Sequence, residues 1–352
     1  MKNFSLIFVI SLFLIFLINL FIALSWPIYS DYKSKKHAFL DEQKEVLKMS
    51  EEDLNILYKE TWRNYDKFTF SPFVGHSETE RKGKFVNFDQ VNGRKVVRPS
   101  NCKSKVYLYG GSTMFGYNVT DDTTIAQELQ NLVGDKYCIF NQGRAYYYSK
   151  QENNLFAQHI ESNHNIDYAL FLDGINEKCG GYEYDRHLDR SFQILIERPY
   201  KMWKKTSTDF IYTLPLIQLY NSIQNKNRWI RRNVANSNIL EIESCKNNIS
   251  IDKLFQKRLN LRHALCKEEK IKCFSFLQPF ASIHGKQSDK LITKKRKEYL
   301  LKKYNLLKKN KKYIIDIGHV LDDDKNLSYV DGAHYSPLSN KKIATEFQSY
   351  ID

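Results

Sequence analysis

The sequence lacks the spacings that mark several common kinds of site. Its six cysteines include no Cys-x-x-Cys pair, so a zinc site is not predicted. Its basic clusters come with neither zinc-finger spacing nor an RNP-type motif, so nucleic-acid binding is not predicted either. Internal repeats and low-complexity tracts are missing, and 42% of the residues are hydrophobic. This composition excludes a disordered chain and predicts a substantial core.

The net charge of +14 is the most biased feature of the composition. The basic clusters are spread along the chain and read KSKK at 33–36, RWIRR at 228–232, KKRK at 294–297 and KKNKK at 308–312. Such clusters are typical of solvated helix faces. A surface that favours anionic glycans or lipid headgroups is the alternative.

The segment from Phe4 to Trp26 contains no charged residue. At 1.5 Å per helical residue it is long enough to span the hydrocarbon core of a membrane. We therefore predict a single-pass anchor within residues 1–30. The letters ALS before Trp26 resemble a signal-peptide cleavage site, so a cleaved signal remains an alternative. Only Lys2 precedes the span whereas KSKK follows it, and the positive-inside rule would then place the C-terminal domain inside the cell.

The cysteines leave the redox compartment open. They are Cys102, Cys138, Cys179, Cys245, Cys266 and Cys273. An even number fits either an oxidising compartment or buried free thiols. Cys102 and Cys138 each stand just before a predicted strand, so they can form a disulfide if those strands are neighbours.

Three regions follow the predicted anchor. Residues 31–66 are charged with scattered apolar positions and predict amphipathic stalk helices, and residues 67–100 predict an irregular lead-in. Residues 101–352 predict an α/β domain. A helical insertion at about 182–268 interrupts it, in which the apolar stretch FIYTLPLIQLYNSIQ at 210–224 predicts a buried, lid-like or interfacial helix.

Short apolar runs alternate with helical patterns in the α/β region. The runs are KVYLYGGS at 105–112, YCIFNQG at 137–143, YALFLDG at 168–174, IKCFSFLQP at 271–279 and KYIIDIG at 312–318. Helices are predicted at 121–134, 149–163, 291–307 and 336–351, the last with Ser336 as N-cap and Pro337 at its first position. This alternation predicts a three-layer α/β/α sandwich around a parallel sheet of about five strands.

Polar residues follow these strands where each one ends. The first run ends in Gly111 and Ser112, the second in Gly143, and the third is followed by Asn176. A loop after the last strand carries DGAHYS from Asp331. In an open parallel sheet, sites form outside the carboxyl ends of the strands, so these side chains are predicted to converge.

Four blocks at these positions resemble the SGNH hydrolases, also called the GDSL esterase/lipase superfamily. They are YGGSTMFGYNV at 109–119, NQGRAYYYSKQE at 141–152, LDGINE at 172–177 and DGAHYS at 331–336. The resemblance covers about residues 105–180 and 310–350 and implies a flavodoxin-like sheet. Gly111 stands where that family often has Asp, and so does Glu177 after the asparagine.

The resemblance also implies roles for individual residues. Ser112 would be the nucleophile, His334 its base and Asp331 the residue that orients the imidazole. The oxyanion would be bound by the N–H groups of Ser112 and Gly143 and by the side-chain amide of Asn176. No metal and no cofactor are implied. The plain alternatives are that Ser112 is a helix N-cap, that Asn176 only forms a turn, and that Asp331 and His334 form a loop ion pair.

The function expected from the resemblance is hydrolysis of acyl esters, with O-acetyl groups on cell-envelope glycans as the expected substrate. Membrane-anchored domains that resemble this family often act on the cell envelope, so the resemblance implies an extracytoplasmic, periplasmic location. This expectation conflicts with the positive-inside rule, which would place the domain inside the cell. An O-acyltransferase, in which a sugar hydroxyl takes the acyl group, is the first alternative. A non-catalytic assembly factor for envelope polysaccharides is the second.

Overall fold

The computed structural model describes residues 7, 10, 11, 13–25, 41–63, 68–177, 250–287, 292, 294–309 and 312–352. The chain divides into one unit of residues 1–38 and 193–239 and another of residues 39–192 and 240–352. The α/β domain lies in the second unit. Most of the predicted insertion, including the apolar stretch at 210–224, lies outside the described residues.

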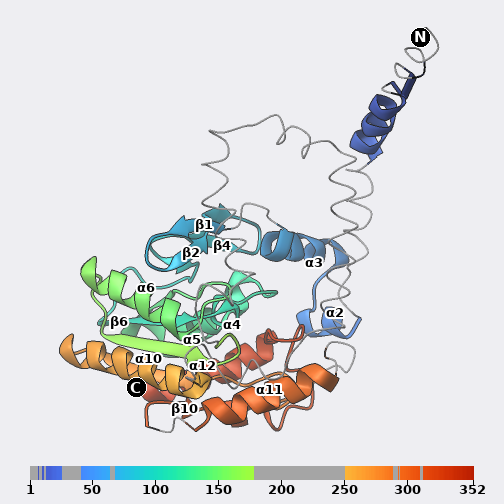
Figure 1. Cartoon of the computed structure of the whole chain (residues 1–352). Coiled ribbons are helices and arrows are strands. Elements are labelled where there is room, and N and C mark those ends of the chain that lie inside the picture. Colours follow the sequence, from blue (N-terminus) through green and yellow to red (C-terminus); the bar gives the residue numbers. More distant parts are fainter. Residues whose placement is uncertain are drawn as a thin grey trace. The chain divides into compact units, whose positions relative to one another are not determined.

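Five parallel strands form one side of an eight-stranded sheet (Figure 1). They are β6 (Ser104–Gly110), β7 (Tyr137–Asn141), β8 (Tyr168–Asp173), β9 (Lys272–Leu277) and β10 (Ile315–Asp316). Their order is β7-β6-β8-β9-β10, and every pair among them is parallel. The predicted parallel sheet of about five strands is therefore confirmed. Because the chain changes direction at β6, the carboxyl ends of β6 and β8 border the crevice in which such sheets bind ligands.

The region predicted as an irregular lead-in forms short strands. They are β1 (Phe68–Ser71), β2 (Gly75–Glu78), β3 (Arg81–Lys82), β4 (Asn87–Asp89) and β5 (Gly93–Arg94). The first two form a separate hairpin, and the other three extend the main sheet beyond β7 in antiparallel order. The sheet is therefore mixed and wider than the sequence predicts.

Helices cover both faces of the sheet. They are α4 (Ser112–Phe115), α5 (Ile125–Val133), α6 (Ser149–Glu161), α10 (Ile251–Glu268), α11 (Lys294–Leu307) and α12 (Pro337–Ile351), with the 3-10 turns η2 (Asp121–Thr123), η3 (Gly134–Lys136) and η6 (Gly318–Leu321). Alternate residues of β6 point into different apolar clusters. Leu108 packs in the cluster of α5 and α12, and Tyr109 packs in the cluster of α6. This alternation is what a strand buried on both faces requires.

The N-terminal helices pack on the domain, although the sequence predicts a stalk there. They are α2 (Asp41–Leu47), α3 (Glu51–Tyr58) and a short π-helix, η1 (Lys59–Arg63). Leu54 and Leu57 of α3 are buried, and Leu57 packs in one cluster with Phe115 and Tyr117 from the turn after β6. Residues outside the predicted α/β region thus contribute to its core.

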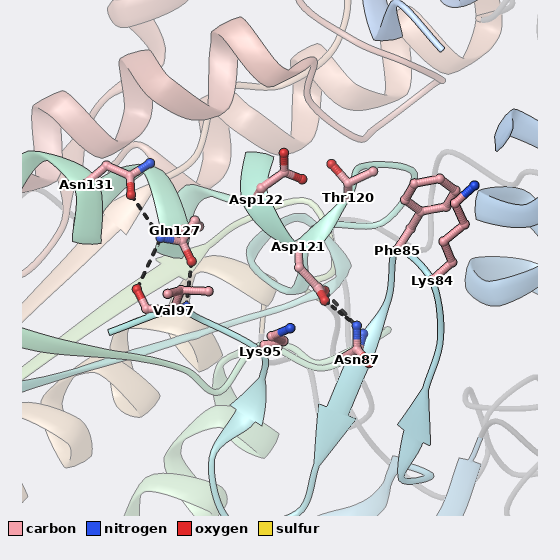
Figure 2. Close-up of a pocket in the computed structure, with 10 residues that line it drawn as sticks. All are labelled: Lys84, Phe85, Asn87, Lys95, Val97, Thr120, Asp121, Asp122, Gln127 and Asn131. Carbon is pink, nitrogen blue, oxygen red and sulfur yellow. Dashed lines mark hydrogen bonds between the residues drawn. The ribbon is translucent and has the colours of Figure 1, made fainter. Parts of the chain in front are cut away.

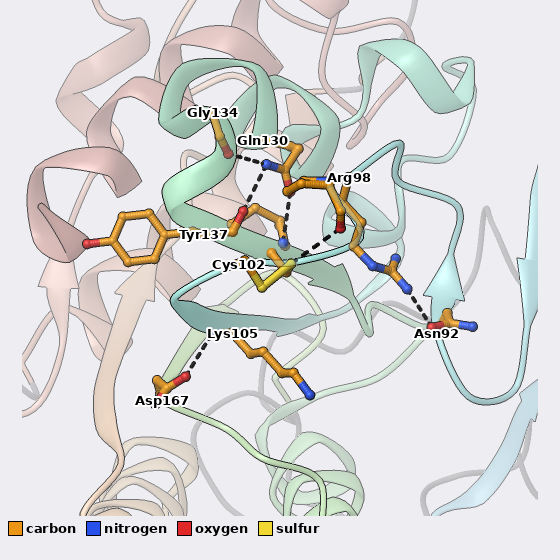
Figure 3. Close-up of a disulfide and its surroundings, with 11 residues drawn as sticks. Asn92, Arg98, Cys102, Lys105, Gln130, Gly134, Tyr137 and Asp167 are labelled. Atoms are coloured by element: carbon orange, nitrogen blue, oxygen red, sulfur yellow. Dashed lines mark hydrogen bonds between the residues drawn. A yellow bond between two sulfur atoms is a disulfide. The ribbon is translucent and has the colours of Figure 1, made fainter.

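A disulfide joins Cys102 to Cys138, the pair that the sequence allows if their strands are neighbours (Figure 3). β6 and β7 are parallel neighbours, and Cys138 on β7 is the register partner of Lys105 on β6. A second disulfide joins Cys266 at the end of α10 to Cys273 in β9. Cys179 and Cys245 lie outside the described residues.

The predicted membrane span is only partly covered. Between residues 4 and 26 the structure describes residues 7, 10, 11 and 13–25. Among the described residues, none forms a helix with the length and apolar character needed to cross a membrane.

Candidate active site

The turn after β6 brings Ser112 and Asn176 together. Ser112 is the first residue of α4, directly after Gly111. A Cβ atom on Gly111 would lie 2.4 Å from Nδ2 of Asn176 and 3.1 Å from the carbonyl oxygen of Tyr147. Only glycine leaves room for the Asn176 amide to lie against this turn. The strand ends therefore converge as the sequence predicts.

Ser112, His334 and Asp331 form one hydrogen-bonded chain. Oγ of Ser112 lies 2.8 Å from Nε2 of His334, and Nδ1 of His334 lies 2.6 Å from Oδ2 of Asp331. Because a carboxylate only accepts, Nδ1 carries the proton and Nε2 is free to accept one from the serine. His334 is buried with 6% of its surface exposed. This arrangement can generate an alkoxide at Ser112.

The Asp331 carboxylate is fixed by its own loop. Its Oδ1 accepts the backbone N–H groups of Ala333 and His334, each at 2.8 Å. Burial alone would raise the pKa of the Asp331 carboxyl. The charge of the facing His334 and the hydrogen bonds from His334 and Ala333 outweigh burial, so the pKa lies below its ordinary value. Asp331 is therefore an anion at neutral pH, as orientation of a cationic imidazole requires.

Aromatic rings from two other elements enclose the imidazole. The Tyr117 ring stacks on His334 with centroids 5.5 Å apart, and the Trp62 ring meets it edge-on at 5.7 Å. Tyr117 donates its hydroxyl to Glu78 at 3.2 Å. Burial, followed by the charge of Glu78, holds the pKa of Tyr117 well above its usual range. The ring is therefore a neutral wall beside the histidine.

Gly143 does not present the free N–H that the sequence predicts. Its N–H donates to Oδ1 of Asn141 at 3.0 Å. A Cβ atom there would lie 2.4 Å from the backbone nitrogen of Phe115, so α4 packs directly against this glycine. The missing side chain admits a helix backbone, not a substrate. Gly143 is thus a packing position of the turn.

Ser112 and Tyr146 offer two other backbone donors. Among the described residues, the N–H groups of Ser112 and Tyr146 have no hydrogen-bond partner. Tyr146 holds φ at 64°, which is strained for a bulky residue and typical of functional turns. The next carbonyl, Tyr147, accepts from Nδ2 of Asn176 at 3.0 Å. An amide has two N–H groups, so one on Asn176 remains to donate. Only the backbone conformation sets Tyr146 apart as a donor, and that conformation cannot be read from the sequence.

A buried charge cluster lies beneath the Asn176 loop. Glu177 accepts the N–H and the hydroxyl of Ser149 at 2.7 and 2.8 Å and pairs with Arg258 at 3.0 Å. One turn along α10, Arg262 pairs with Asp173 at 2.6 Å and with Glu152 at 3.2 Å. The two acidic residues near Asn176 in the chain, Asp173 and Glu177, are thus both bound by arginines of α10. This network holds the amide donor in place.

Three acidic side chains face two guanidinium groups in this cluster, so the positive charges do not match the acids one for one. Burial, followed by the charge of Asp173, holds the pKa of Glu152 well above its ordinary value. A carboxyl whose pKa is raised on folding stabilises the protein at low pH, and this contribution is lost as the pH rises above about 4.3 through the raised pKa. We expect Glu152→Gln to flatten the fall in unfolding free energy over that window. Urea unfolding from about pH 4 to about pH 9 measures it. Parallel curves for the variant and the wild type would contradict the assignment.

Two cavities of the described domain are lined by neither Ser112 nor His334. One of about 290 Å³ lies beside Asp121, which binds Asn87, and beside Gln127, which binds Val97 and Asn131 (Figure 2). The other, of about 610 Å³, lies between α6 and α10. Neither cavity is lined by Ser112, His334 or Asp331, so neither belongs to the candidate active site.

Comparison with known proteins gives distant structural likeness only. No family model matches the chain, and no curated protein matches it. The acetyl xylan esterase AlAXEase is 13% identical, with a TM-score of 0.37 over 70% of this chain and all of that one. Est24, a carbohydrate acetylesterase from Sinorhizobium meliloti, is 11% identical, with a TM-score of 0.36 over 71% of this chain and 98% of that one.

An acetyl xylan esterase from Geobacillus stearothermophilus is 11% identical, with a TM-score of 0.39 over 71% of this chain and 95% of that one. The chain is thus similar to several esterases of known structure.

Proposed function

We propose that this protein is a serine esterase of SGNH type that hydrolyses acyl esters. The observation that carries the proposal is the chain of 2.8 and 2.6 Å contacts from Ser112 through His334 to Asp331. A loop ion pair explains the contact between Asp331 and His334 alone. It does not explain why the second imidazole nitrogen meets a serine at a strand end.

The reaction proceeds through an acyl-enzyme. Nε2 of His334 takes the Ser112 proton as Oγ attacks the ester carbonyl, and the imidazolium then returns this proton to the leaving alcohol. Water attacks the acyl-serine next and gives its proton to Nε2. Collapse of the second intermediate releases the acid and restores the serine hydroxyl.

The oxyanion of both intermediates is bound by the Ser112 N–H and the Asn176 amide. The Tyr146 N–H takes the place that the sequence assigns to Gly143. Each such donor contributes about 3–4 kcal/mol to transition-state stabilisation. Tyr146 holds a left-handed backbone conformation, which costs free energy in a residue of this size. Such strained residues cluster at active sites, which supports a role for the Tyr146 N–H in this one.

The substrate we propose is an O-acetyl group on a cell-envelope glycan. Tyr146 is 46% exposed, and its ring contacts the Phe68 ring with centroids 6.1 Å apart. An exposed aromatic ring of this kind suits the apolar face of a sugar. A net charge of +14 also favours anionic polymers.

The location we propose is extracytoplasmic, with the apolar segment at residues 4–26 as the anchor. The disulfides Cys102–Cys138 and Cys266–Cys273 support this side of the membrane, because disulfides persist in oxidising compartments. The positive-inside rule favours the opposite side, but it depends only on Lys2 and the KSKK cluster near the span.

The test is turnover of p-nitrophenyl acetate by the full chain in detergent. We expect Ser112→Ala to lose at least about 10³-fold in kcat with unchanged thermal unfolding. Ser349→Ala, on the exposed face of α12, is the matched control and should retain full activity. Equal turnover by Ser112→Ala and wild type would refute the mechanism. Acetate transferred to added sugar, in place of free acetate, would assign the transferase alternative.

A further inference from the structure

Asn118 occupies a strained and buried position directly after the nucleophile helix. It is 2% exposed and holds φ at 62°, a conformation that Asn tolerates better than other residues with a side chain. The buried guanidinium of Arg94 fixes this turn by donating to the carbonyls of Gly116 and Val119, at 2.8 and 2.9 Å. The turn is therefore held so that the Asn118 side chain points in one direction.

Both ends of the Asn118 amide are bound. Its Nδ2 donates to Oδ2 of Asp331 at 2.6 Å, the same oxygen that faces Nδ1 of His334. Its Oδ1 accepts the indole N–H of Trp62 at 2.5 Å. An indole only donates and a carboxylate only accepts, so both partners require the same orientation of the amide. If the amide were turned over, two oxygens would face each other at Asp331.

Trp62 comes from the segment that precedes the α/β core. It lies in the π-helix η1, a rare element that is frequently found at functional sites. The carboxylate of Glu60 in η1 accepts the backbone N–H groups of Lys84, Phe85 and Val86 at 2.7–2.9 Å. The Trp62 ring also contacts Tyr117 edge-on at 4.9 Å. The segment is thus attached to the domain next to Tyr117, the residue whose ring stacks on His334.

We propose that Asn118 and Trp62 are positioning residues that extend the chain Ser112–His334–Asp331 by two members. This inference rests on the proposed esterase function. Backbone N–H groups hold one oxygen of Asp331, and Asn118 holds the other toward His334. Trp62 holds the amide of Asn118 in the orientation that donates. The N-terminal segment between the predicted anchor and the core therefore completes the active site.

One substitution tests each added member. Asn118→Gly keeps the left-handed backbone but removes the amide, and Trp62→Phe keeps an aromatic ring but removes the N–H. We expect Asn118→Gly to lower kcat about 10- to 100-fold, the usual effect of losing a hydrogen bond to a charged group, with KM within about two-fold. Trp62→Phe should lower kcat about 3- to 10-fold. Because Trp62 acts through Asn118, the double variant should match Asn118→Gly.

Asn163→Gly is the matched control, because Asn163 is an exposed residue with φ at 57° in the turn after α6. It should retain full activity. Losses that multiply in the double variant, or an Asn118→Gly variant with kcat within about two-fold of wild type, would overturn the proposal. If Asn118→Gly does not fold, an unchanged kcat in Trp62→Phe overturns it.

A readout independent of turnover separates this proposal from the proposed function. The downfield proton resonance of the His334 Nδ1–H reports its hydrogen bond to Asp331. We expect Asn118→Gly to shift or broaden this resonance and Asn163→Gly to leave it unchanged. If wild type does not hydrolyse p-nitrophenyl acetate, the esterase assignment fails while this shift still supports the added members. An unchanged resonance in Asn118→Gly overturns them.

Discussion

Asp331→Asn is expected to lower kcat for p-nitrophenyl acetate about 10⁴-fold with the fold intact. The two backbone N–H groups at 2.8 Å hold Oδ1, so the new amide nitrogen takes the place of Oδ2. That nitrogen donates, and it faces Nδ1 of His334. The imidazole must then carry its proton on Nε2, where it cannot accept one from Ser112.

The measurement is steady-state kinetics together with thermal unfolding. Asp135→Asn, on the exposed η3 turn, is the matched control and should behave as wild type. An Asp331→Asn variant that keeps more than about a tenth of wild-type kcat would show that this carboxylate does not set the tautomer of His334.

Arg262→Met is expected to lower the free energy of unfolding by about 3–5 kcal/mol. The guanidinium is 2% exposed and donates to Asp173, Glu152 and Ser275. It also stacks on the Phe171 ring, with its central carbon 3.8 Å from the centroid. Methionine fills part of the volume but leaves the carboxylates buried without their partner.

Urea unfolding at neutral pH measures this loss. Lys267→Met changes an exposed cation on the same helix and should shift the unfolding free energy by less than about 0.5 kcal/mol. A similar small shift in Arg262→Met would mean that the cluster contributes little to stability. In that case α10 would hold the Asn176 loop by apolar packing alone.

The parallel strands could be predicted from the sequence, and so could the convergence of Ser112, His334 and Asn176 at one edge of the sheet. Both follow from the pattern of apolar and polar residues along short segments. Buried parallel strands are continuous apolar runs, and a polar residue at the end of such a run lies at the sheet edge. The Ser336 N-cap of α12 was predicted on the same local basis and is confirmed.

The remaining features depend on contacts distant in sequence. The lead-in strands β3, β4 and β5 have only two or three residues each, too few for a periodic pattern. Trp62 and Asn118 meet across 56 residues, and Asn118 meets Asp331 across 213. Gly143 was misassigned because a glycine that admits a helix backbone and one that admits substrate look the same in sequence.

The proposed mechanism requires Ser112 to be a nucleophile that His334 activates. Labelling of the full chain with a fluorophosphonate, followed by peptide mass spectrometry, tests it without knowledge of the natural substrate. We expect the label on Ser112 in wild type and a large loss of labelling in His334→Ala. Labelling of another serine, or no label on a folded wild-type protein, would contradict the claim.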